Sequence, residues 1–281
     1  MHHKAEKFFL MFLSLSCFIC FCSQVQGYVL KSPHILDLMT KKIAGAERLS
    51  VSQKLIIFTK NPDNTQVEFA ETLKYIFPDK FRSEIVSEHT EKTHVVSDGV
   101  SITLADGNIV SESEKLFDLY KDILLYNERE LLQKRLYKLG VDVSVSSFGL
   151  FKDKTAFVIG AEYPDKSLPQ LWIDKETFLP LRWIVKVNTD ENSLFEFRYF
   201  EWKRTNKVWY PGRIEFYKNS ILMRKIDVNS ITVNTVFPVE LFNIEHIRSL
   251  YIHTDSCDSD NKEDGMSEVE KTIEEFNSLF E

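Results

Sequence analysis

Apolar side chains recur at helical spacing around residue 40, so that they would share one face of a helix. Ser32 and Pro33 suit the start of this helix, because serine is a good cap and proline fits the first helical position. The pattern therefore predicts an amphipathic helix over residues 33–46. Its apolar positions are Ile35, Leu36, Met39, Ile43 and Ala46.

The period of the pattern changes to two after this helix, which is typical of half-buried β-strands. Around residue 72, one face carries Phe69, Leu73 and Tyr75, while Glu68 and Lys74 fall on the other. Strands are predicted over residues 51–58, 67–77, 81–87, 93–96 and 101–104.

Helical spacing then returns over residues 115–126 and again from Asn127 to Leu139, where Gly140 is the expected stop. Strands follow once more. They are predicted over residues 142–149, 154–163, 168–174, 179–188, 194–204, 208–217 and 221–235. An acidic linker over 255–265 precedes a final amphipathic helix over 266–280, which either docks on the domain or meets a partner.

Aromatic side chains fall on both faces of one predicted strand. Phe195, Phe197 and Tyr199 share one face, and Phe200 and Trp202 share the other. A sheet with two apolar faces must cover both of them. Helices can cover one face, and the other requires strong curvature or a lipid-like ligand. An ordinary core beneath helices remains the alternative.

The first residues predict the compartment. Lys4 and Lys7 precede an apolar run of about 15 residues, shorter than the ~20 that a membrane-spanning helix needs. Small residues end this segment, so we predict a secretory signal peptide over residues 1–27, cleaved after Gly27. A retained membrane anchor is the alternative. The predicted location is the periplasm.

The net charge limits the classes of partner, and the cysteine content limits the disulfides that the chain can form. The whole chain has a net charge of −7. Removal of the signal takes away two lysines and Glu6, which leaves −8, and an acidic chain repels nucleic acid. Cys257 would then be the remaining cysteine, which predicts a fold without an internal disulfide.

Motifs for catalysis are missing from the sequence. It contains no phosphate-binding loop, nucleophile elbow or zinc-protease motif. His89 and His94 are five residues apart in a predicted β region, which places them on opposite faces. The acidic run 255–264 fails the pattern of a calcium loop. We therefore predict no enzymatic activity, no metal site and no cofactor.

Several short segments together resemble the LolA family, the periplasmic carriers of outer-membrane lipoproteins. They occur in the right order and spacing after the predicted signal peptide. A later segment resembles the strand–turn–strand of outer-membrane lipoprotein-sorting relatives. The segments are LSVSQKL (49–55), FPDKFR (77–82), VVSDG (95–99) and QLWIDKETFLPLR (170–182).

This resemblance implies an α+β fold that is mainly antiparallel β: an open, strongly curved half-barrel whose concave face is covered by helices. The helices over 33–46 and 115–139 would form a lid, and acyl chains would enter an apolar cavity beneath it. One position departs from the family. Phe77 stands where the carriers have an arginine that ties the lid to the sheet, so their release mechanism does not transfer.

The predicted domains are the signal peptide (1–27), a LolA-like lipid-binding domain (28–254) and the C-terminal linker and helix (255–281). The predicted function is non-covalent binding of lipid acyl chains or of a lipidated protein, for transport across the envelope. Membrane proteins are candidate donors or acceptors of this cargo. The alternative is a sensory or scaffold module of the envelope that binds a protein partner.

The predicted cavity lining consists of apolar side chains on the successive strands, and two arginines near turns are candidate headgroup contacts. The lining residues are Phe69, Leu73, Tyr75, Phe77, Phe157, Ile159, Trp172, Trp183, Phe197, Tyr199 and Phe216. The headgroup candidates are Arg82 and Arg182, for which a role as structural salt-bridge partners is the alternative.

Overall fold

A computed structural model describes residues 29–58, 66–87, 90–186 and 194–253. The chain divides into two units, Met1–Leu30 and Lys31–Glu281, and all the described helices and strands belong to the second. The predicted signal peptide, the acidic linker and the helix at 266–280 lie outside the described residues.

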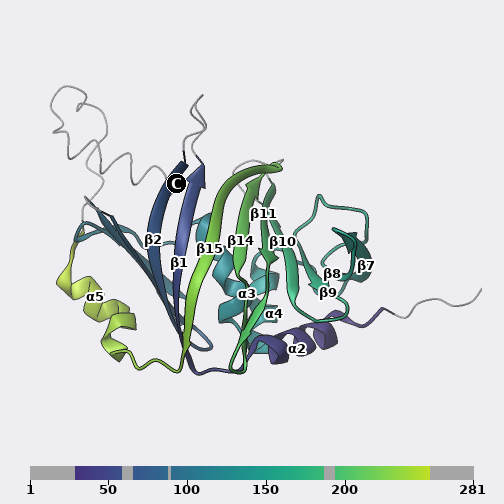
Figure 1. Ribbon diagram of the computed structural model, residues 1–281, viewed down its shortest axis with the longest axis horizontal. Coiled ribbons are helices and arrows are strands. Elements are labelled where there is room, and N and C mark those ends of the chain that lie inside the picture. Colours follow the sequence, from purple (N-terminus) through teal and green to yellow (C-terminus); the bar gives the residue numbers. More distant parts are fainter. Residues whose placement is uncertain (1–28, 59–65, 88–89, 187–193, 254–281) are drawn as a thin grey trace, which may run out of the picture. The chain divides into compact units, whose positions relative to one another are not determined.

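One large sheet dominates the second unit, with 14 described strands in the order β16-β6-β5-β4-β3-β2-β1-β15-β14-β11-β10-β9-β8-β7 (Figure 1). β16 pairs in parallel with β6, and the other neighbouring strands pair antiparallel. The strands before the helical segment are β1 (Arg48–Phe58), β2 (Gln66–Ile76), β3 (Lys80–Val86), β4 (Glu91–Ser97), β5 (Val100–Ala105) and β6 (Asn108–Ser111).

The strands after the helical segment include a small separate hairpin formed by β12 and β13. These strands are β7 (Ser146–Phe151), β8 (Lys154–Ile159), β9 (Gln170–Asp174), β10 (Pro180–Lys186), β11 (Leu194–Phe200), β12 (Lys203–Thr205), β13 (Val208–Tyr210), β14 (Arg213–Lys218), β15 (Ile221–Val233) and β16 (Ile252–His253).

Helices lie on both faces of the sheet. α2, the 3₁₀ helix η1, α3 and α4 cover one face, which we call the covered face (Figure 1). The 3₁₀ helix η2 and α5 lie on the opposite, outer face over β3–β6. The helices are α2 (Ser32–Ile43), η1 (Leu116–Lys121), α3 (Asp122–Leu125), α4 (Arg129–Lys138), η2 (Val239–Phe242) and α5 (Ile244–Leu250). Within the described part of the chain, no helix has both the length and the apolar character that crossing a bilayer requires.

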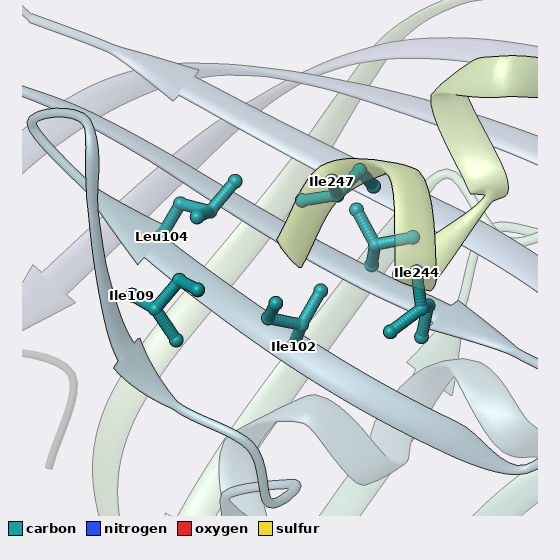
Figure 2. Packing of buried hydrophobic residues seen from close by; sticks show 6 residues of the cluster. Ile102, Leu104, Ile109, Ile244 and Ile247 are labelled. Atoms are coloured by element: carbon teal, nitrogen blue, oxygen red, sulfur yellow. The ribbon is translucent and has the colours of Figure 1, made fainter. Parts of the chain in front are cut away.

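A second small core holds α5 to the outer face. Ile244 and Ile247 point from the helix onto Ile102, Leu104 and Ile109 of the strands below, as Figure 2 shows. All are buried. Alternation along the strands explains this placement: Val95 also belongs to the cluster, while its neighbour His94 faces the other side.

The mainly antiparallel β class and the helical segment between two groups of strands are confirmed. Details differ. α2 ends at Ile43, and Ser32 does not cap it, because its hydroxyl donates to the Val145 carbonyl (3.1 Å). The predicted strand 194–204 ends at Phe200, where the β12–β13 hairpin takes over. β6, η2, α5 and β16 were not predicted, since each is too short to show a period.

The α5 core gives a stability prediction. Ile247→Ala should lower the free energy of unfolding by about 2–4 kcal/mol, because it opens a cavity in a buried cluster. Leu250→Ala is the matched control on the same helix, since Leu250 is 62% exposed. Urea unfolding measures both variants. Equal effects of the two changes would show that α5 is not anchored by this core.

Candidate ligand-binding face

A row of apolar side chains crosses five strands on the covered face. The strand register places Ile159, Leu171, Trp183, Phe197 and Phe216 directly opposite one another in succession. Residues that pair in this way share one face of the sheet. At most 1% of any of these side chains is exposed. They form a continuous apolar wall, the kind of surface that a hydrocarbon chain can contact.

The segment η1–α3 lies directly on this wall. The Phe117 ring meets Phe195 edge-on at 4.8 Å between centroids, and Tyr120 meets Phe216 in the same way at 5.3 Å. The Tyr199 hydroxyl donates to the Tyr120 carbonyl at 2.9 Å. Most of this contact is thus between apolar rings, and specific polar contacts hold the segment in place.

A buried ionic cluster ties η1, α3 and α4 to one another. Lys121 Nζ lies 2.6 Å from a Glu114 oxygen, and Arg135 Nε lies 2.6 Å from an Asp122 oxygen. Lys121 and Asp122 are fully buried. Burial opposes ionisation of Glu114, but Lys121 and Arg135 outweigh it and lower its pKa to about 2. Three of the four charges lie on η1, α3 and α4, and Glu114 lies in the connection between β6 and η1, two residues before η1 begins.

Beside the wall, η1 closes over a small polar cavity of about 30 Å³, which has room for a water molecule. Glu71 accepts hydrogen bonds from Gln53 (2.6 Å) and from Ser83. Asp118 of η1 lies 3.9 Å from His94, whose Nε2 is buried without a hydrogen-bond partner. Lys92 and Arg224 also line the cavity, and the Arg224 guanidinium stacks 3.3 Å from the centre of the Phe117 ring.

Burial dominates the electrostatics of this cavity. It lowers the pKa of His94 to about 4, that of Lys92 to about 8 and that of Arg224 to about 9. Burial also raises the pKa of Glu71. Asp118 behaves differently: its pKa falls despite burial, because His94 and Lys92 favour its charged form. His94 is therefore neutral at physiological pH.

The structure brings most of the predicted lining residues to one face. Strand alternation places nine of them on the covered face, and Phe77, just beyond β2, stacks on Tyr75 at 5.5 Å. The nine are Phe69, Leu73, Tyr75, Phe157, Ile159, Trp183, Phe197, Tyr199 and Phe216. Whether they line a ligand cavity stays a prediction.

Three predicted site residues lie on the outer face instead. Trp172 pairs with Val158 and Arg182, one step out of phase with the apolar wall. Arg182 donates to Glu196 (2.6 Å), and Arg82 donates to the Leu241 carbonyl of η2 (3.1 Å). Their register separates all three from the covered face, and both arginines bind the protein itself.

Arginines cover the aromatic side chains of the outer face. Arg182 lies 5.5 Å from the centre of a Trp172 ring, and Arg198 lies 3.8 Å from that of Tyr217. Gly149 lets β7 approach closely, because a Cβ there would sit 2.6 Å from the Trp172 ring. Flat guanidinium groups stack well on aromatic rings. This explains how a strand can be aromatic on both faces without a second layer of helices there.

The polar cavity was not predicted from the sequence. Its members come from β1–β4, η1, β14 and β15, and only the pairing of distant strands brings them together. The available signal was local: Lys92, His94 and Arg224 are charged or polar residues within predicted β regions. Lys121 and Asp122 similarly interrupt an apolar helical pattern.

No family model matches the sequence, and no curated protein is similar to it in sequence. Solved structures do match. A LolA superfamily protein from Nitrosomonas europaea has a TM-score of 0.52 at 13% identity, over 78% of this chain and 100% of the other. A DUF1329 family protein from Desulfovibrio piger has a TM-score of 0.50 at 13% identity, with the same coverage.

An outer membrane lipoprotein-sorting protein domain from Vibrio parahaemolyticus has a TM-score of 0.49 at 12% identity, over 76% of this chain and 97% of the other. The first two matches show that the fold of this chain is LolA-like. The resemblance drawn from short sequence segments is thus confirmed at the level of the fold.

Burial of His94 gives a pH prediction. Its pKa is about 4 in the folded protein and near 6.5 when unfolded, so the unfolded chain binds the extra proton between these values. Stability should therefore fall by about 3 kcal/mol from this group as the pH drops from 6.5 to 4. His94→Gln keeps a hydrogen-bonding side chain beside Thr103 and cannot titrate.

Urea unfolding of both proteins between pH 7 and pH 4 measures this contribution, since the carboxylates other than Asp118, which interacts with His94, are common to both. The variant should lose less stability than the wild type over that range. Parallel pH profiles would mean that His94 does not stay neutral in the folded protein.

Proposed function

We propose that this protein binds the acyl chain of a lipid or lipidated protein on the covered face of its sheet, without catalysis, and carries it through the periplasm. The observation that carries this proposal is the continuous apolar wall beneath a helical segment that is cross-linked mainly to itself. The LolA-like fold is consistent with such a carrier. Each methylene group removed from water contributes about 0.8 kcal/mol, which is enough to hold a chain reversibly.

Binding requires the helical segment to move. The enclosed cavity of about 30 Å³ has no room for a chain. The ion pairs among Glu114, Lys121, Asp122 and Arg135 would survive a displacement in which Glu114 moves together with η1, α3 and α4. The contacts to be broken are ring packing and polar contacts such as Tyr199 to Tyr120. We also propose that the sheet is an open, strongly curved half-barrel with the covered face concave.

The helical segment already fills the space over the covered face, and this favours a second candidate function. If the helical segment never opens, the wall is an ordinary core, and the protein is a sensory or scaffold module of the envelope that binds a protein partner. Uptake of a hydrocarbon chain separates the two candidates. Trp183, at the centre of the wall, provides the reporter.

Brominated dodecanoate quenches tryptophan fluorescence at short range and is the probe for this face. We expect saturable quenching of the wild-type protein, because the chain displaces the helical segment and reaches Trp183. Trp183→Phe should remove that part of the quenching while calorimetry still detects binding of the chain. Wild-type protein in which Trp183 is never quenched, at any probe concentration, would favour the scaffold module.

The hydroxyl of Tyr199 should control the rate of uptake. Tyr199→Phe removes its hydrogen bond to the helical segment, which should accelerate uptake by about three- to ten-fold, the equivalent of roughly 1 kcal/mol. Tyr217→Phe is the matched control: it loses a hydrogen bond to Glu215 (2.8 Å) on the outer face. Stopped-flow quenching compares them. Equal rates in both variants would contradict opening of the segment at this contact.

A further inference from the structure

A separate open pocket of about 430 Å³ lies at one end of the sheet. The β7–β8 turn, the β9–β10 turn, the end of β11 and the β12–β13 hairpin meet there. Ligand pockets for small molecules are usually of this size and mostly apolar. Its apolar lining includes Leu179, Leu181, Phe200, Trp202 and Trp209.

The charged rim of this pocket has one cation in excess. Asp174 pairs with Lys154 (3.1 Å), and Glu201 pairs with Arg213 (2.8 Å). Lys152 is exposed, and its ammonium lies 4.3 Å from the centre of the Phe200 ring. Within the described residues, no carboxylate forms an ion pair with Lys152. A negative group at the mouth of the pocket would therefore complement the rim.

The polar groups around the floor are already engaged. Trp202 Nε1 donates to the Pro180 carbonyl at 2.9 Å. One Asp174 oxygen accepts from the backbone of Glu176 and Thr177. A sugar would need hydrogen-bonding groups that these contacts already use, whereas a hydrocarbon chain needs only the apolar floor.

We propose that this pocket binds a single-chain anionic amphiphile of the fatty-acid type, with its chain against Trp202 and Trp209 and its carboxylate at Lys152. This site contains none of the five residues of the apolar wall, although Tyr199 of the covered face also lines it. It does not depend on movement of the helical segment, because the pocket is already open.

Calorimetry with dodecanoate, methyl dodecanoate and acetate tests the site on the purified full chain. Lys152→Gln should weaken dodecanoate binding by about three- to five-fold and leave the methyl ester unchanged, as expected for one exposed charge pair. Lys166→Gln is the matched control, an exposed lysine away from the pocket. Acetate should not bind, since it lacks the chain.

Thr177→Phe fills the pocket and should weaken the pocket's binding of both dodecanoate and its methyl ester by at least ten-fold, with binding on the covered face unchanged. Near-UV circular dichroism checks that this variant is folded, and Lys152→Gln provides the test if it is not. Quenching by brominated dodecanoate locates the chain: the double variant Trp202→Phe/Trp209→Phe should lose the quenching that arises in this pocket, while Trp183 reports the covered face.

Three results would overturn the site: wild-type dodecanoate affinity in both Thr177→Phe and Lys152→Gln, acetate binding as tightly as dodecanoate, or binding only to anionic phosphatidylglycerol vesicles with no uptake of monomers. Quenching of Trp183 alone would also reject the pocket while leaving the proposed function intact. Quenching of Trp202 and Trp209 alone would support the pocket and reject the proposed function on the covered face.

Discussion

The sheet has to cover two apolar faces, and the rest of the structure depends on the two different ways in which it does so. On one face, helices lie over a wall that includes Trp183 and Phe197. On the other, arginines stack on Trp172 and Tyr217 while α5 packs over the first strands. Hydrophobic burial drives both coverings.

The buried charges of the helical covering pair with one another. Lys121 and Asp122 are completely buried, and such charges are tolerated only when they are paired. Their partners are Glu114, just before η1, and Arg135 of α4. Toward the sheet, the segment offers mainly rings and the polar cavity around Asp118. The proposed carrier function requires these ion pairs to persist when the segment moves away from the sheet.

The polar cavity makes the covered face unlike a plain hydrocarbon surface. Glu71, Lys92, His94, Asp118 and Arg224 surround a space of about 30 Å³. Burial disfavours the charged forms of His94 and Lys92. The protonation of these two side chains therefore depends on the groups that pack against them. The open pocket at the far end of the same sheet has the opposite character, an apolar floor with an exposed cation.

The sequence by itself determined the class of the fold and its order of elements. Alternation around Phe69 and Tyr75, and helical spacing from Ile35 to Ile43, depend on local periodicity, and both are present in the structure. The tertiary structure decided which faces meet. Trp172 and Trp183 look alike in the sequence, yet strand register sends them to opposite faces. The cavity, the arginine stacks and the α5 core join residues from distant strands, and the pairing of such strands cannot be read from local pattern.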